Sequence, residues 1–193
     1  MRSAGGSRTI EDPDLTATDR AALLALARRA IEAAIAGRPP PPPPDVPGAA
    51  LCRGAFVTLE EEGALRGCIG RIAGDRPLGE VVPSVAVSAA RDDPRFPAVS
   101  PGELPRLRIE ISVLRPPQRL EPVEPASLVL GVDGLVVRRD RAVGVLLPQV
   151  ATEHRLDPEA FLAAACRKAG LPPGSWREPD TEVFTFHADV FGE

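Results

Sequence analysis

The chain has 193 residues, 44% of them hydrophobic, and a formal net charge of −4. This length suits one large domain or two small ones, and the apolar fraction is ordinary for a protein with a sizeable core. The negative charge argues against a nucleic-acid binder, because such proteins need a basic face. One Trp and no Tyr also leave little aromatic surface for stacking bases.

Three widely spaced cysteines, Cys52, Cys68 and Cys166, do not resemble a disulfide framework, so we expect free thiols in a reducing compartment. The thiols and the two histidines lack the spacing of a zinc or iron–sulfur site, and no metal or cofactor is expected. The sequence has no apolar run as long as a membrane span and no secretory signal at Met1–Thr9. We therefore expect a cytoplasmic protein that binds neither membranes nor nucleic acid.

Composition also suggests how the chain is divided. Residues 1–14 are polar and expected to be flexible, whereas residues 15–193 are expected to form a single domain. Its first half covers 15–116 and its second half 126–193. Within the first half, the proline-rich loop 38–50 contains an unbroken proline run that excludes helix and interior strand. A stiff spacer is the favoured interpretation, and a docking site for a proline-binding domain is the alternative.

Periodicity and turn residues predict a hairpin, a helix and a strand in each half, after an N-terminal helix that starts at Thr16 or Thr18. The first half contains strands Ala55–Leu59 and Leu65–Ile69, helix Leu78–Ala90 and strand Leu107–Leu114. The second half contains strands Gly134–Arg138 and Ala142–Leu147, a helix from Asp157 to Gly170 and strand Val183–Phe191, with a short strand at Leu128–Leu130. Because hairpins join most strands, the sheet should be largely antiparallel, in an α+β fold.

The stretch Leu65–Gly70 departs from what packing alone requires. Cys68 lies between Gly67 and Gly70, and glycine inside a strand marks a close approach of backbone or ligand. Alternation along a strand places Arg66 on the same side as Cys68, where a guanidinium would favour the thiolate. The residues therefore indicate a site without naming a reaction.

An overlay of the two halves supports this interpretation. It aligns Arg66–Gly70 with Gly144–Pro148, where the second half has mostly ordinary apolar residues. The second copy then indicates which residues packing alone requires at this position. Cys68 departs from them, which suggests that it does more than fill space.

These motifs together resemble the AMMECR family, called protein A of the AmmeMemoRadiSam system in microbes. The matching stretches are Phe56–Leu59, Leu65–Gly70, Asp93–Phe96, Ile109–Leu114, Leu147–Ala151 and Lys168–Leu171, followed by Trp176. The resemblance implies a duplicated hairpin–helix–strand unit around a mostly antiparallel, barrel-like sheet. It also implies a Memo-type protein and a radical SAM enzyme as partners, and it leaves the biochemical activity open.

Three hypotheses follow for Cys68. In the first, Cys68 is a nucleophile or covalent attachment point for a small molecule, assisted by Arg66. Polar residues within the family motifs then line the same pocket: Asp93, Arg95, Glu110 and Gln149.

In the second hypothesis, the Arg66–Cys68 hairpin recognises a partner or ligand without catalysis. In the third, Cys68 is a small buried hydrophobe, as we expect for Cys52 and Cys166. The first hypothesis lacks an evident general base, because His154 and His187 are both compatible with surface positions.

Overall fold

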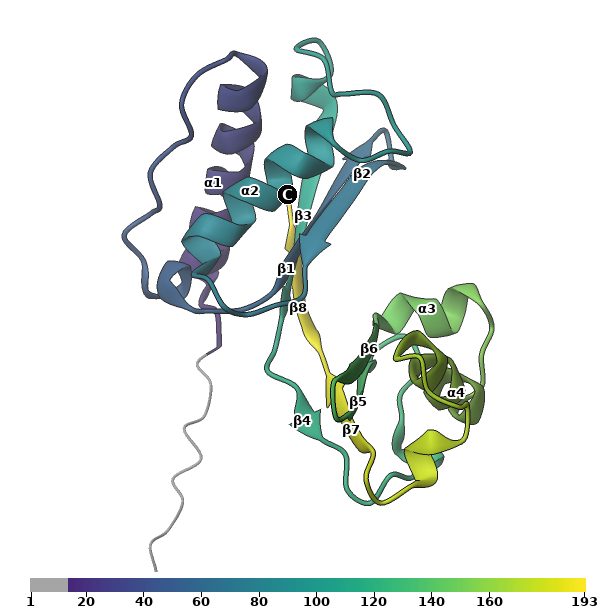
Figure 1. Ribbon diagram of the computed structural model, residues 1–193. Coiled ribbons are helices and arrows are strands. Elements are labelled where there is room, and N and C mark those ends of the chain that lie inside the picture. The colour runs from purple at the N-terminus through teal and green to yellow at the C-terminus, as the bar shows by residue number, and fades with distance from the viewer. Residues whose placement is uncertain (1–13) are drawn as a thin grey trace, which may run out of the picture.

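The computed structural model describes residues 14–193 and has two lobes, each built on its own antiparallel sheet (Figure 1). The predicted flexible segment lies, except for Asp14, outside the described residues. The first lobe has the sheet order β2-β1-β3-β8 and the second has β4-β7-β5-β6. The α+β fold with antiparallel sheets is therefore confirmed, but a single barrel-like sheet is not formed, because the strands divide between two open sheets.

Helices α1 and α2 cover one face of the first sheet (Figure 1). The elements of this lobe are α1 (Ala17–Ile35), β1 (Ala55–Glu61), β2 (Ala64–Arg71), α2 (Leu78–Arg91), β3 (Leu107–Leu114) and β8 (Ala188–Gly192). The predicted cap of α1 is confirmed: Thr16 accepts from the Asp19 N–H, and the Asp19 carboxylate accepts from the Thr16 N–H. Alternate residues of β1 and β3 are buried against the helices, so their opposite faces are turned toward the second lobe.

The second lobe repeats this plan with shorter elements and a separate core. They are β4 (Gln118–Arg119), β5 (Gly134–Arg139), β6 (Ala142–Leu146), α3 (Pro148–Glu153), α4 (Pro158–Lys168) and β7 (Glu182–Phe186). Phe161 and Leu162 of α4 are fully buried against Leu135 of β5. The short strand expected at Leu128–Leu130 is absent; this lobe instead gains β4 from the proline-rich connection after β3.

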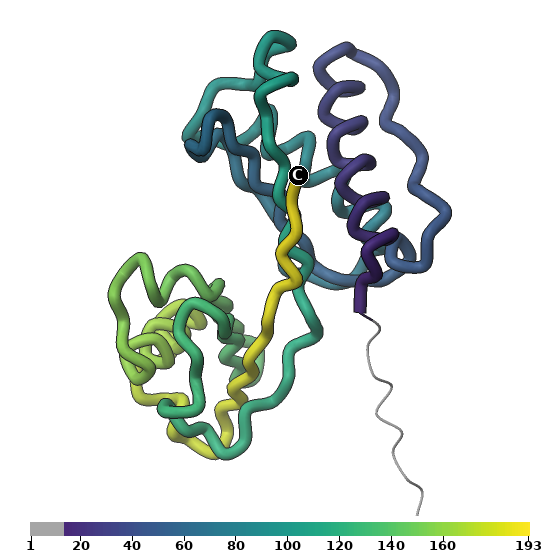
Figure 2. Tube along the Cα trace, turned by 180° about the vertical axis from the view of Figure 1, so that it is seen from behind, coloured from purple at the N-terminus to yellow at the C-terminus, as the bar shows by residue number. Residues whose placement is uncertain are grey.

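The two halves exchange their last strands. β4 follows β3 in the chain but pairs with β7, and β8 follows β7 but pairs with β3. The two crossings run side by side between the lobes, seen as teal and yellow segments in Figure 2. The Arg115 N–H donates to the His187 carbonyl at 2.8 Å where they pass. Each lobe is thus completed by a strand from the other half, whereas the expectation of a single domain remains a prediction.

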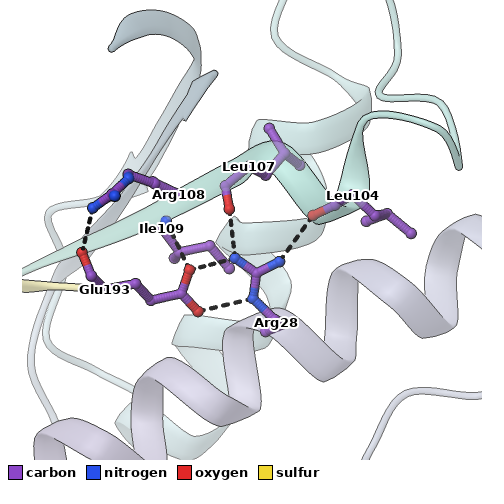
Figure 3. A network of polar contacts seen from close by, with 6 residues as sticks. All are labelled: Arg28, Leu104, Leu107, Arg108, Ile109 and Glu193. Carbon is purple, nitrogen blue, oxygen red and sulfur yellow. Dashed lines mark hydrogen bonds and ion pairs between the residues drawn. The ribbon is translucent and has the colours of Figure 1, made fainter. Parts of the chain in front are cut away.

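A polar cluster holds the exchanged strand β8 in the first lobe (Figure 3). Arg28 of α1 donates to both carboxylate oxygens of Glu193, with Nε–Oε1 at 2.8 Å. The same guanidinium donates to the carbonyls of Leu104 and Leu107 at 3.1 and 2.7 Å. The Glu193 backbone N–H donates to the Ile109 carbonyl at 3.1 Å. One arginine therefore ties α1, the start of β3 and the end of β8 together.

The proline run Pro39–Pro44 forms neither helix nor strand, as expected. Most of its residues are exposed, while Pro41 and Pro44 are partly buried. A spacing of three residues is one turn of a polyproline II helix, so one edge of the run rests on the protein.

Candidate functional site

A cleft of about 430 Å³ lies between the lobes. Its floor is the face of the first sheet that the helices leave uncovered: Phe56, Thr58, Cys68, Glu110, Ser112, Leu114, Ala188 and Val190. The second lobe supplies the opposite wall: Gly131, Val132, Leu147, Pro148, Gln149 and His187. Cys68, Glu110 and Gln149, three of the residues predicted for a pocket, thus line one cavity.

Cys68, Thr58 and Glu110 form one row across the floor. Thr58 on β1 pairs with Cys68 on β2 and with Glu110 on β3. The Thr58 hydroxyl donates to Cys68 Sγ at 3.4 Å. Cys68 is half-buried, and no other hydrogen bond to its sulfur is formed within residues 14–193. The Thr58 hydroxyl therefore fixes the position of the sulfur at the cleft floor.

The backbone of Cys68 is held by the loop after α2. β2 is an edge strand, and the Cys68 N–H, which points away from β1, donates to Asp93 Oδ2 at 2.8 Å. Arg95 Nη2 lies 3.4 Å from the Cys68 carbonyl, and it also donates to Asp93 at 2.8 Å. Asp93 and Arg95 thus form hydrogen bonds with the Cys68 N–H and carbonyl, the backbone groups that a further strand would otherwise pair with. They position Cys68 from the side of the strand, outside the cleft lining.

The charge on Asp93 is stabilised by the same contacts. Hydrogen bonds from Arg95 and from the Cys68 N–H hold the pKa of this carboxyl well below its usual range. Asp93 is buried and stays ionised, so the Cys68 backbone contact is charge-assisted. Reciprocally, the hydrogen bond to Asp93 raises the pKa of Arg95.

Arg66 does not line the cleft with Cys68, which corrects the prediction of a shared face. The pairing of β1 with β2 shifts between Leu59 and Glu60, so Arg66 falls in a β-bulge that breaks the alternation. Its Nε donates to Glu103 Oε1 at 2.7 Å, and its guanidinium lies 6.0 Å from the centre of the Phe96 ring. Arg66 therefore anchors the loop 92–106.

The flanking glycines make close packing contacts, and their assignment as binding residues stays a prediction. A Cβ on Gly67 would lie 2.2 Å from the Ala89 carbonyl oxygen of α2, so this strand touches the helix backbone. A Cβ on Gly70 would lie 2.1 Å from the Phe56 ring, which covers that glycine. Both close approaches are the kind that strand glycines permit.

The second lobe supplies an internal comparison for the row. Gly144 on β6 meets the α4 backbone as Gly67 meets α2, with a Cβ 2.4 Å from the Ala165 oxygen. The structure therefore aligns Gly67 with Gly144, one residue away from the sequence overlay. The residues equivalent to Cys68, Thr58 and Glu110 are then Val145, Val136 and Phe184. All three polar residues of the first row are apolar in the second.

A model of the AMMECR1 family matches residues 24–191. This chain belongs to the AMMECR1 family. Its relatives include a protein of Methanothermobacter thermautotrophicus, 52% identical over 73% of this chain and 76% of that protein. Protein TK0174 of Thermococcus kodakarensis is 46% identical over 89% of this chain and 88% of its own. The crystal structure of the uncharacterised protein PH0010 from Pyrococcus horikoshii has a TM-score of 0.71 at 44% identity and covers 89% of both chains.

The AMMECR1-family chain also places His187 at the cleft, in contact with Asp133, and sequence reasoning missed this contact. His187 Nε2 lies 2.6 Å from Oδ1 of the buried Asp133. His187 precedes β8, three strands from Cys68 and five residues further along the sheet than Glu110. Strand spacings then place Cys68 and His187 roughly 20 Å apart. His187 therefore lies at the far end of the cleft and is no base for Cys68 in this arrangement.

The remaining sequence candidates lie outside the cleft. His154 is the C-terminal cap of α3 and is exposed. Cys166 is fully buried in the second core, as expected, and burial raises the pKa of its thiol. Cys52 is exposed, so its assignment to packing was wrong. No helix in residues 14–193 is long and apolar enough to cross a membrane, and no cluster of metal-binding side chains occurs there.

Proposed function

We propose that this AMMECR1-family protein binds a small molecule in the cleft between its lobes and reacts with it covalently through Cys68. In the proposed step, the Cys68 thiolate, whose proton has passed to solvent, adds to the carbon of a polarised C=O or C=C bond of the ligand. The C–S bond forms as the π bond breaks, and the atom that takes up the π electron pair is protonated by solvent, so no group leaves. The observation that carries the proposal is the row of Cys68, Thr58 and Glu110 on the cleft floor. In the duplicated lobe the three equivalent positions are the apolar residues Val145, Val136 and Phe184.

The surroundings of Cys68 support this chemistry rather than a filling role. The cleft borders the sulfur, Thr58 donates to it, and Asp93 fixes the backbone beneath it. A reactive group held on a strand, with its neighbours anchored by hydrogen bonds, is oriented before a ligand arrives. Arg66 takes no part in activating the thiol in this proposal, because it is paired with Glu103.

The test is the rate at which iodoacetamide alkylates each thiol between pH 5 and 9, followed by peptide mass spectrometry. Exposed Cys52 is an internal reference, and buried Cys166 is expected to react only on unfolding. We expect Cys68 to react faster than Cys52 at pH 7. If Cys68 reacts no faster than Cys52 at pH 7, or reacts only when the protein unfolds, covalent chemistry at this position is refuted.

The resemblance to AmmeMemoRadiSam protein A extends the proposal to a pathway shared with a Memo-type protein and a radical SAM enzyme. A non-catalytic adaptor is the second candidate, in which the hairpin that carries Cys68 contacts a partner through the exposed side chains of Leu65, near the start of β2, and Ile72, just after its end. Pull-down with the two proposed partners separates these functions. An adaptor would lose binding in a Leu65→Ser, Ile72→Ser variant, whereas the covalent function would be lost in Cys68→Ser with partner binding intact.

A further inference from the structure

We propose that the cleft ligand carries a positively charged amine, bound by Glu110, next to the group that meets Cys68. This inference rests on the proposed function, because it concerns the same cleft. The alternative suggested by the sequence, an anionic group bound by Arg66, does not suit the geometry, since Arg66 is engaged by Glu103 outside the cleft.

The arrangement of charges instead favours a cation.

The cations nearest to Cys68 are already neutralised. Arg66 is paired with Glu103, and Arg95 is paired with Asp93, with nitrogen–oxygen distances of 2.7 and 2.8 Å. Glu110, in contrast, has neither an ion pair nor a hydrogen bond from its side chain to any residue of 14–193. It is the one carboxylate lining the cleft within that range, and no Lys or Arg lines it there. The floor therefore carries an uncompensated negative charge.

The nearest cation on the same face of β3 does not offset this charge. Arg108 lies two residues before Glu110 and opposite Glu60 in the pairing of β3 with β1. Its Nη1 donates to the Glu193 carbonyl at 3.3 Å, at the end of β8, and Arg108 is not a cleft residue. A cation entering the cleft thus meets Glu110 without a competing side chain.

The remaining floor residues suit an ammonium group attached to an apolar body. The Thr58 and Ser112 hydroxyls can accept hydrogen bonds from an ammonium, and the half-buried Phe56 ring offers a face that attracts cations. Leu114 and Val190 provide apolar contact beyond them. The second lobe lacks all of this polarity at the equivalent row, so the charge is specific to the first sheet.

Two thiol reagents of opposite charge test the inference on the full chain carrying Cys52→Ser. Each methanethiosulfonate forms a mixed disulfide with Cys68 and releases methanesulfinate, one reagent carrying an ethylammonium group and the other an ethylsulfonate. Cys68 and Glu110 are two strands apart, about 10 Å, a distance at which a charge still acts in a cleft. We expect the cation-to-anion rate ratio to exceed that of free cysteine by about tenfold.

The matched variants remove one charge each. Glu110→Gln should lower the ratio about tenfold, while Glu62→Gln, in the exposed hairpin turn, should leave it within about twofold. As a second measurement, benzylamine should slow alkylation of Cys68 by neutral iodoacetamide, and phenylacetate should not. Circular dichroism and the melting temperature establish that each variant is folded.

The outcomes separate this inference from the proposed function. If Cys68 reacts with none of the reagents, the accessible thiol and the proposed function fail together. If Cys68 reacts readily but the ratio equals that of free cysteine, or is unchanged in Glu110→Gln, the cationic ligand is refuted and the reactive thiol stands. Protection by phenylacetate rather than benzylamine would likewise overturn the inference.

Discussion

The contact of Gly67 with helix α2 leads to a prediction that separates folding from the site. In Gly67→Ala, the new Cβ would lie 2.2 Å from the Ala89 carbonyl oxygen, a backbone atom that cannot rotate away. β2 must then move away from α2 by about 1 Å, and overpacking of this kind costs typically 1–3 kcal/mol. Because the obstacle is backbone, we expect the upper end, about 3 kcal/mol. For a chain of this size that lowers the melting temperature by about 6–12 °C.

The second lobe provides the matched variant. In Gly144→Ala the Cβ would lie 2.4 Å from the Ala165 oxygen and from the Ala169 nitrogen, so a similar loss of stability is expected. Gly102→Ala is the neutral control, since nothing lies within 4 Å of its Cβ. Urea unfolding followed by circular dichroism measures the free energies. Iodoacetamide labelling under native conditions measures Cys68.

Only Gly67→Ala should alter the alkylation rate of Cys68, because only that substitution displaces the strand that carries the thiol. The reasoning is refuted if Gly67→Ala is as stable as the parent within about 0.5 kcal/mol, the range of neutral surface changes. It is also refuted if Gly144→Ala changes Cys68 reactivity as much as Gly67→Ala does. The first result would show that Gly67 does not lie in close contact with helix α2. The second would show that a change in the second lobe affects Cys68 as much as a change in the first.

Three further predictions concern polar contacts. Arg28→Ala should lower the free energy of unfolding by about 2–3 kcal/mol, because charge-assisted bonds are lost and partly buried partners remain, as measured by urea unfolding. Hydrogen bonds from Arg66 and Ser100 lower the pKa of Glu103 to about 2, so its contribution is complete above about pH 4.5 and is lost as the pH falls toward 2. In Glu103→Gln, the free energy of unfolding should therefore fall less steeply as the pH is lowered below about 4.5. Asp93→Ala should speed hydrogen exchange at the Cys68 amide at least tenfold, measured by NMR or mass spectrometry.

Local patterns in the sequence predicted most of the elements and two residues of the cleft floor, Cys68 and Glu110. The Thr16–Asp19 cap and the buried alternation of β3 depend on neighbours in the chain, and both are present in the structure. The alternation of residues along β2 also placed Gly67 and Cys68 on opposite faces of the strand. Gly67 contacts helix α2, and Cys68 lines the cleft. Such features follow from backbone geometry and need no distant partner.

The parts that were missed depend on distant segments. The bulge that diverts Arg66 to Glu103 is a property of strand pairing, and a regular alternation cannot reveal it. The exchange of β4 and β8 involves pairings across most of the chain, and it decides that the floor faces a wall from the other lobe. Thr58 could have been found as the cross-strand neighbour of Cys68 once the hairpin register was known.

The exchange of strands has a consequence for how this molecule can be divided. A polypeptide holding only the first half would keep β4, for which it has no sheet, and would leave β3 without its neighbour β8. Two such half-chains could satisfy each other by trading those strands about a twofold axis, as swapped dimers do. The fold therefore resembles a strand-swapped dimer whose two subunits are joined in one continuous chain. Its two copies are then free to diverge, one retaining plain packing and the other acquiring a thiol.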